Sequence, residues 1–183
     1  MPARIAILAA PLALAIGALV PAMAVGAPSS GRIQCRVQEN GEPASGTMTA
    51  TPKAGRGKAI EGSCDAPHRI APGTYEVTVH LDGALDRPSK KETIEVRPGR
   101  IARVPVNFST GTLRVQLETE GRRAAGLAVI YRDGKRIGTL GSGVSGHLST
   151  GTYDVVVRHR TDERRFEDVT IRRGQKRTVK AEF

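Results

Sequence analysis

After residue 30 the chain repeats itself once, and this repeat limits the fold more than any other feature. It shows in three pairs of matching segments, namely 31–33 with 111–113, 72–77 with 150–155, and 97–108 with 172–183. The offset between the copies falls along the chain from 80 to 78 to 75 positions, which predicts insertions and deletions in loops between shared strands. A repeat of this length predicts two domains of about 75 to 80 residues each instead of one domain of about 155 residues. We therefore expect one domain at residues 31–108 and a second at residues 111–183.

Both copies alternate apolar and polar residues at period two, as half-buried strands require. Residues 32–38 and 112–118 alternate in this way, and so do the segments that begin at Tyr75 and at Tyr153. Return and closing strands are expected in matching places, at 93–97 and 104–108 in the first copy and at 169–173 and 179–183 in the second. No stretch after residue 30 has a sustained helical period. We predict an all-β fold class with two tandem Greek-key β-sandwiches.

The most specific local prediction is a β-hairpin between Leu127 and Leu140. Its turn is Asp133-Gly134, a pair that tolerates the positive φ angles of a type I′ turn. A cluster rich in Ser and Gly follows, from Gly138 to Gly146. Because this cluster lacks the G-x-S-x-G pattern of a hydrolase nucleophile, we interpret it as a mobile loop.

A Gly-Thr-Tyr motif occurs at Gly73-Thr74-Tyr75 and again at Gly151-Thr152-Tyr153. In each copy it is followed by alternating Val residues, a turn, and a closing segment that ends in V-x-V/A-x-F. With this pattern each copy resembles the carboxypeptidase regulatory-like and transthyretin-like domains. The resemblance implies a seven-stranded Greek-key sandwich in an accessory module of exported proteins, with no catalytic residues to carry over. The first copy departs from the common form at Arg69-Ile70, where an aromatic or apolar strand entry is usual.

Residues 1–24 have the three parts of a secretory signal peptide. Arg4 supplies the positive start, residues 5–20 are almost wholly apolar, and Ala22-Met23-Ala24 is a small-x-small cleavage site. Cleavage is expected after Ala24, with a second candidate site after Ala27, and it leaves no transmembrane segment. The alternative, an uncleaved membrane anchor, fits the length of the apolar run but not the well-placed cleavage site. We therefore expect a periplasmic or secreted protein.

Export places the two cysteines, Cys35 and Cys64, in a compartment that oxidises thiols. We predict a disulfide between them within the first domain, worth about 3 kcal/mol by loop-closure entropy. The alternatives are a metal pair and a redox pair, and the spacing of 29 positions supports neither. Cys35 aligns with Val115 and Cys64 with Ser142, so the first domain is expected to use a covalent link where the second uses packing.

The sequence lacks motifs for catalysis or for a metal site. The four histidines are scattered, without the short spacings of metal ligands, and the acidic residues do not form pairs that recur in both copies. The only aromatic residues are three Tyr and three Phe, which disfavours an aromatic-lined cleft or a base-stacking platform. We therefore expect no enzyme activity, no cofactor and no metal.

An excess of basic residues is the one feature that points to a ligand. The chain has 28 Lys and Arg against 18 Asp and Glu, a net charge of +10, and more of this excess lies in the second copy. Strand alternation and turn positions give six candidate anion-binding residues there: Arg158, Arg160, Arg164, Arg165, Arg172 and Lys180. Arg164 and Arg165 are expected in a turn, and the others form a basic stripe if their strands share a sheet. The alternative is a solvated face, partly neutralised by nearby carboxylates.

Together these observations predict a non-enzymatic protein-interaction or structural module of a bacterial-type cell envelope. Its expected ligand is an unknown protein partner or an acidic envelope polymer. The competing hypothesis makes electrostatic binding of an envelope polyanion or polysaccharide the main function, through the basic face of the second domain. Nucleic acid is disfavoured, because export removes the usual target and no aromatic residue is interleaved with the arginines. The short junction at Ser109-Thr110 predicts limited freedom between the domains.

Overall fold

The computed structural model describes residues 30–54 and 57–183, so the expected signal peptide lies outside the described residues. All regular structure in these two ranges is β-strand, which confirms the all-β fold class. None of the described residues belongs to a helix that is long and apolar enough to cross a membrane.

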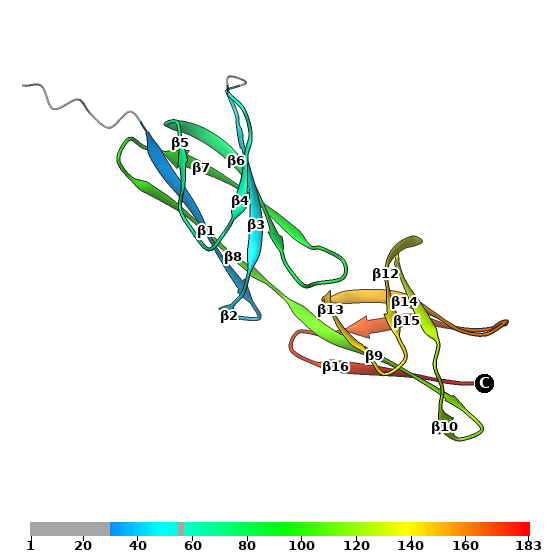
Figure 1. Ribbon diagram of the computed structural model, residues 1–183. Helices are drawn as coiled ribbons and strands as arrows, with labels where there is room; N and C mark the ends of the chain where they lie inside the picture. The colour runs from blue at the N-terminus through cyan, green and yellow to red at the C-terminus, as the bar shows by residue number, and fades with distance from the viewer. Residues whose placement is uncertain (1–29, 55–56) are drawn as a thin grey trace, which may run out of the picture.

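The strands fall into two halves of the chain, which are separate lobes in Figure 1. The described strands of the first half are β1 (Gly31–Glu39), β2 (Glu42–Pro43), β3 (Gly46–Pro52), β4 (Ile60–Ser63), β5 (His68–Ile70), β6 (Gly73–Leu81), β7 (Ser89–Val96) and β8 (Ile101–Phe108). Those of the second half are β9 (Thr110–Thr119), β10 (Arg122–Arg123), β11 (Leu127–Arg132), β12 (Lys135–Gly141), β13 (Ser145–Ser149), β14 (Gly151–His159), β15 (Asp162–Ile171) and β16 (Lys176–Glu182). Only Ser109 separates β8 from β9.

Each half contains two four-stranded sheets, and the second half repeats the strand order of the first. In sheet A, β8 pairs along one edge of β1, while β2 and β5 share the other edge. Sheet B has the order β4-β3-β6-β7. In sheet C, β9 is flanked in the same way by β16 and by β10 with β13, and sheet D has the order β12-β11-β14-β15. The four sheets are used under these names below.

The inward side chains of each half form a separate hydrophobic core between its two sheets. Ile33 and Cys35 of sheet A meet Val77 and Val79 of sheet B, and all four side chains are at most 1% exposed. The second half has its own core of the same kind, centred on residues such as Leu113 and Val155. The period-two alternation seen in the sequence therefore identified the inward positions of these strands. The same alternation explains why Arg69-Ile70 departs from the aromatic or apolar strand entry of the family pattern. Ile70 is buried and fills the inward position, whereas Arg69 points to solvent.

The Gly-Thr-Tyr motif has one structural role in both halves. Gly73 and Gly151 have φ angles of 150° and 152°, in the region that favours glycine. The tyrosine that follows is buried, and its hydroxyl donates a hydrogen bond to the carbonyl four residues earlier, at 2.9 Å in each half. This arrangement is the tyrosine corner of Greek-key sandwiches. The repeat of the motif thus reflects a repeated backbone corner.

The disulfide between Cys35 and Cys64 is present, as predicted. The aligned positions also match in space, because the amide of Cys64 donates to Gly46 O just as the amide of Ser142 donates to the carbonyl of Gly126. The second half uses packing at this place, as expected, because Val115, which aligns with Cys35, is fully buried in its core. There the side-chain oxygen of Ser142 accepts a hydrogen bond from the amide of Leu117, at 3.1 Å. Packing of Val115 and a hydrogen bond from Ser142 to β9 therefore take the place of the covalent link.

The predicted hairpin is confirmed as β11 and β12, with φ angles of 51° at Asp133 and 73° at Gly134. The prediction of a loop from Gly138 to Gly146 was wrong for most of its length. Gly138 to Gly141 belong to β12 and Ser145 begins β13, so only three residues form the connection. Small residues in a paired strand hid the strand period from the sequence analysis.

A loop of the first half, residues 82–88 between β6 and β7, packs against the second half. Ala84 belongs to the first core, whereas its neighbour Leu85 packs on the second core and donates its amide to His147 O at 2.9 Å. The side chain of Asp86 is only 5% exposed and accepts hydrogen bonds from the amide of Ser149 and from the hydroxyl of Tyr153. Burial, and then the carboxylate charge of Asp86, raise the pKa of Tyr153 well above its usual value. We call this contact the joint.

The end of β1 completes the joint on its other side. Glu39 accepts hydrogen bonds from the hydroxyl of Thr110 and from Nδ1 of His147, the latter at 3.0 Å. Asn40 exchanges hydrogen bonds with Thr110, and its carbonyl accepts one from Arg173 at 2.8 Å. Contacts on both sides of the β8–β9 junction resist rotation about that junction in either direction.

We expect the contribution of Glu39 to stability to be lost in acid. Burial acts to raise the pKa of Glu39, but the hydrogen bonds from Thr110 and His147 and the charge of His147 outweigh it, so the pKa lies below 4.5. A lowered folded-state pKa stabilises the fold above the unfolded value, and this stabilisation disappears as the pH falls through the folded value. Urea unfolding between pH 7 and pH 3 should therefore show a gap between the wild type and Glu39→Gln that closes below about pH 4. A gap of constant size would contradict this assignment.

Candidate anion-binding site

The six basic residues predicted to bind anions lie at the β14–β15 hairpin, in the turn between β15 and β16, and on β16. Arg158 is on β14, and Arg160 is in the two-residue turn that follows, with a φ angle of 52°. The expectation that Arg164 and Arg165 lie in a turn was wrong, because both belong to β15, where they pair with Val157 and Val156. The turn is shorter than expected because the strands stay paired as far as the pair of His159 with Asp162.

These six residues do not form one basic stripe. β14 and β15 share sheet D, but β16, which carries Lys180, belongs to sheet C. On the outer face of sheet D, Arg158 pairs with Glu163 at 2.9 Å and Arg165 with Glu167 at 3.6 Å. Arg164 instead lies over the ring of Phe183, 5.7 Å from its centroid. Most of the predicted positive charge is therefore paired with carboxylates or directed to another side of the molecule.

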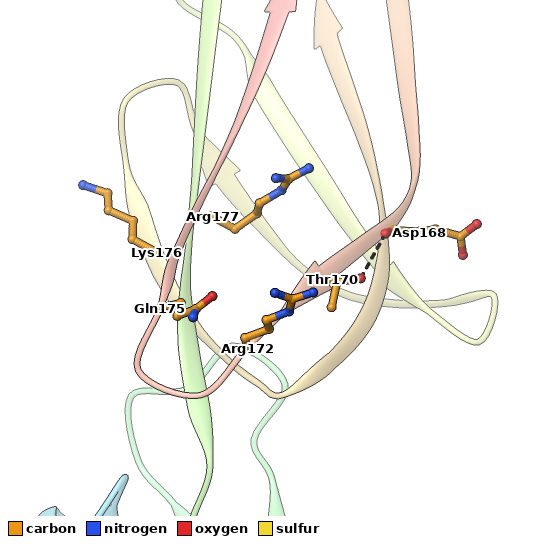
Figure 2. Close-up of a pocket in the computed structure, with 6 residues that line it drawn as sticks. All are labelled: Asp168, Thr170, Arg172, Gln175, Lys176 and Arg177. Carbon is orange, nitrogen blue, oxygen red and sulfur yellow. Dashed lines mark hydrogen bonds between the residues drawn. The ribbon is translucent and has the colours of Figure 1, made fainter.

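Arg172 is the exception, because it lines a hollow with two further cations. The hollow has a volume of about 340 Å³ and lies where the end of β15 meets the start of β16. The residues that line it are Asp168, Thr170, Arg172, Gln175, Lys176 and Arg177 (Figure 2). Arg172 and Arg177 direct their guanidinium groups to the same side, whereas Lys176 extends to the opposite side and the carboxylate of Asp168 points away from both guanidinium groups (Figure 2). None of the three cations is in an ion pair with another residue of the described ranges.

A tight turn fixes the backbone that carries these cations. Gly174 has a φ angle of 66°, and its amide donates to the carbonyl of Thr110, while the amide of Gln175 donates to that of Arg172. The turn is therefore fixed to β9 by its backbone. Two guanidinium groups held in this way can each form paired hydrogen bonds with one carboxylate or phosphate group, since the planar fork of Arg matches such oxygens.

Strand parity hid part of this hollow from the sequence analysis. Arg177 pairs with Leu113, which points into the core, so its parity predicts an inward side chain. It is nevertheless exposed, because it lies at the beginning of β16, beyond the end of the core. The useful signal was the run of basic residues around a glycine turn from Arg172 to Arg177. Of the basic residues in this run, only Arg172 was among the six predicted anion-binding residues, because strand parity and not the glycine turn was the basis of that prediction.

Among the described residues, no group of three or more His, Cys, Asp or Glu side chains could hold a metal ion. No family model and no curated protein matches the chain, so the resemblance to carboxypeptidase regulatory-like domains stays a prediction.

Solved structures that are similar to this chain include a minor pilin, a pilus adhesin and the TIE protein of Bacillus anthracis. The minor pilin GBS52 of Streptococcus agalactiae is 12% identical, with 84% of this chain and 94% of that chain covered and a TM-score of 0.45. The TIE protein of Bacillus anthracis is 17% identical, with 84% of this chain but only 34% of that chain covered and a TM-score of 0.34. The pilus adhesin SpaC of Lactobacillus rhamnosus GG is 11% identical, with coverages of 83% and 31% and a TM-score of 0.31. Identities and TM-scores this low carry no argument about function.

Proposed function

We propose that the chain is an exported, non-enzymatic interaction module of a bacterial-type cell envelope, built from two β-sandwich domains at residues 31–108 and 111–183. In this proposal the second domain binds an acidic protein partner through the hollow formed by Arg172, Lys176 and Arg177. The observation that supports the proposal is that the guanidinium groups of Arg172 and Arg177 face the same side of one hollow and neither is in an ion pair with a described residue. Two guanidinium groups that face the same side suit a single anionic group, such as the carboxylate of an Asp or Glu side chain.

The geometry favours this hollow over the broad basic face of the competing hypothesis. An extended polyanion on the outer face of sheet D would have to compete with Glu163 and Glu167, which already pair with the arginines there. In the hollow, the carboxylate of Asp168 points away from Arg172 and Arg177, so an incoming carboxylate meets two guanidinium groups that are not in an ion pair. Charge-assisted hydrogen bonds to a guanidinium are about twice as strong as neutral ones, so one well-placed carboxylate suffices as an anchor.

The test is to capture a partner from an envelope extract on the immobilised mature protein and then to measure the affinity of the purified partner. We expect Arg172→Gln with Arg177→Gln to weaken binding at least tenfold, or about 1.4 kcal/mol or more. Arg122→Gln with Arg123→Gln removes the same charge from exposed positions of β10 and should change the affinity less than twofold. Arg172→Lys with Arg177→Lys keeps the charge but loses the planar fork, and it should give an intermediate loss. Equal binding by the first variant and the β10 control would refute the proposed site.

A further inference from the structure

The outer face of sheet A, in the first half, carries a second group of basic residues that the charge totals of the two halves conceal. The positions of β1, β5 and β8 with outward parity include four exposed arginines: Arg32, Arg36, Arg69 and Arg103. The other outward positions of sheet A are uncharged: Gln34, Gln38, Pro43, Ile101, Pro105 and Asn107. None of the four arginines is in an ion pair with a described residue. We call these four residues the arginine strip.

The carboxylates of the first half lie elsewhere. The strands of sheet B carry Glu61, Glu76, Glu92 and Glu95. Two of these are already paired, Glu76 with Lys91 and Glu95 with Arg97. The outer face of sheet A therefore carries arginines without carboxylates, whereas the strands of sheet B carry these four glutamates together with Lys90 and Lys91. A face that only kept the protein in solution would mix both signs of charge, as the outer face of sheet D does.

The arrangement of the strip is unfavourable without an anion. Arg32 and Arg69 stand directly opposite each other on antiparallel strands. Like charges in that position destabilise a sheet, because the two Cβ atoms are only about 5 Å apart. No carboxylate on the same face of sheet A offsets the repulsion. A ligand that places negative charge between the two guanidinium groups would remove it.

The second half shows that the fold does not require these arginines. From the register of the strands, the positions that match the strip are Thr112, Gln116, His147 and Thr178. The buried positions between them stay apolar in both halves, as with Ile33 and Leu113. The core has therefore kept its character across the repeat, whereas the four outward positions became arginine in one half only.

The spacing of the strip suits a chain of charges. Arg32 and Arg36 are four residues apart on β1, which is about 13 Å at the usual rise of a strand. Arg103 lies beside Gln34, midway between them on β8, so successive guanidinium attachment points are about 8 Å apart. Beyond Arg36 the strip opens into a hollow of about 440 Å³ lined by Gln38, Pro43 and Pro105.

We propose that the arginine strip is a binding site for a linear polyanion that carries phosphate or carboxylate groups along its length. The site lies in the first half and does not depend on the hollow of the second half. A polymer is favoured over a compact anion because the four charges extend along β1 instead of converging on one point. Counterion release from such a polymer adds a favourable contribution to binding for each arginine that is engaged.

The test uses the full mature chain with two linear probes, long-chain inorganic polyphosphate and poly-L-glutamate of matched charge number, and with tripolyphosphate as the compact anion. We expect at least one polymer to bind more than tenfold more tightly than tripolyphosphate, and the tighter polymer identifies the preferred group. Arg32→Gln with Arg69→Gln should weaken polymer binding at least tenfold in 50 mM salt and reduce the slope of log K against log salt by about 1 to 2. The β10 control, Arg122→Gln with Arg123→Gln, should lose less than twofold.

A second variant separates binding from folding. Arg69→Glu replaces a repulsive pair with an attractive one, so without polymer it should raise the melting temperature by about 1 to 4 °C while it abolishes polymer binding. A fall in the melting temperature would mean that the arginine supports the fold. Equal losses of polymer binding in the strip variant and the β10 control, or equal affinity for tripolyphosphate and the polymers, would overturn the proposal.

Discussion

Replacing Cys35 with Val and Cys64 with Ser is expected to lower the free energy of unfolding by about 3 to 4 kcal/mol. The two substitutions introduce the residues that the second half has at the matching positions, so each new side chain suits a β-sandwich of this topology. The disulfide closes a loop with a sequence separation of 29. By the loop-closure relation, a link of that length removes about 12 cal/mol/K of entropy from the unfolded chain. Loss of the disulfide is therefore expected to destabilise the fold mainly by raising the entropy of the unfolded chain.

Urea unfolding with and without a thiol reductant measures this contribution. Reductant should bring the wild type down to the stability of the double variant and leave the variant itself unchanged. The m-value of the variant should rise, because an unfolded chain without the link exposes more surface. If the variant unfolds at the wild-type urea concentration, the disulfide does not stabilise the fold through chain entropy.

Period-two patterns and turn chemistry were the reliable guides to the fold. The inward parity of Val77 and Val155 and the type I′ turn at Asp133 depend only on residues that are close together in sequence. Such local patterns determine which side chains of a strand point inward and where a hairpin turns. The pairing of Arg158 with Glu163 depends instead on the length of a hairpin turn. The turn was expected to include Arg164 and Arg165, but it has only two residues, and the extra strand pairing places both arginines on β15. The predicted stripe therefore failed where the turn length was misjudged.

The two basic sites illustrate a different limit. Net charge summed over each half pointed to the second half. Whether an arginine such as Arg32 belongs to a basic cluster depends, however, on which residues lie beside it on the neighbouring strand. The pairing of β1 with β5, which sets Arg32 against Arg69, joins residues 37 positions apart. No local pattern contains that information. A summed charge also cancels the carboxylates of sheet B against the arginines of sheet A, although the two groups lie on different sheets.

The joint between the halves was signalled in the sequence, but only indirectly. The repeat offset falls from 78 to 75 between Gly73 and Arg97, and this is where the first half has the longer loop, residues 82–88. The matching connection of the second half, between β14 and β15, has only two residues. A loop that is longer in one copy marks a place where that copy does something that the fold alone does not require.

We expect Asp86→Ala to lower the free energy of unfolding by about 2 to 4 kcal/mol and to loosen the two halves from each other. The carboxylate accepts hydrogen bonds from the amide of Ser149, at 3.1 and 3.2 Å, and from the hydroxyl of Tyr153 at 3.0 Å. It also lies 3.6 Å from Nη1 of Arg132. Its removal leaves the buried amide without an acceptor, and such a group costs more than the net value of the bond that was lost.

The hydroxyl of Tyr153 makes the effect specific to the joint. It has one proton and two acceptors, Asp86 and the carbonyl of Ser149, whereas the hydroxyl of Tyr75 has only the equivalent carbonyl. After Asp86→Ala, Tyr153 can still form its tyrosine corner, so the second half should keep its fold. The lost stability should then appear as independent movement of the halves, and the radius of gyration in small-angle X-ray scattering should increase.

Asp82→Ala is the matched control for this prediction. Asp82 lies in the same loop and is exposed, and its amide, which the substitution keeps, donates to the carbonyl of Ser45. The control should change the free energy of unfolding by less than about 0.5 kcal/mol, as surface substitutions usually do. If the two variants unfold alike and scatter alike, Asp86 does not hold the joint. If Asp86→Ala alone loosens the joint, Asp86 fixes the orientation of the arginine strip relative to the hollow.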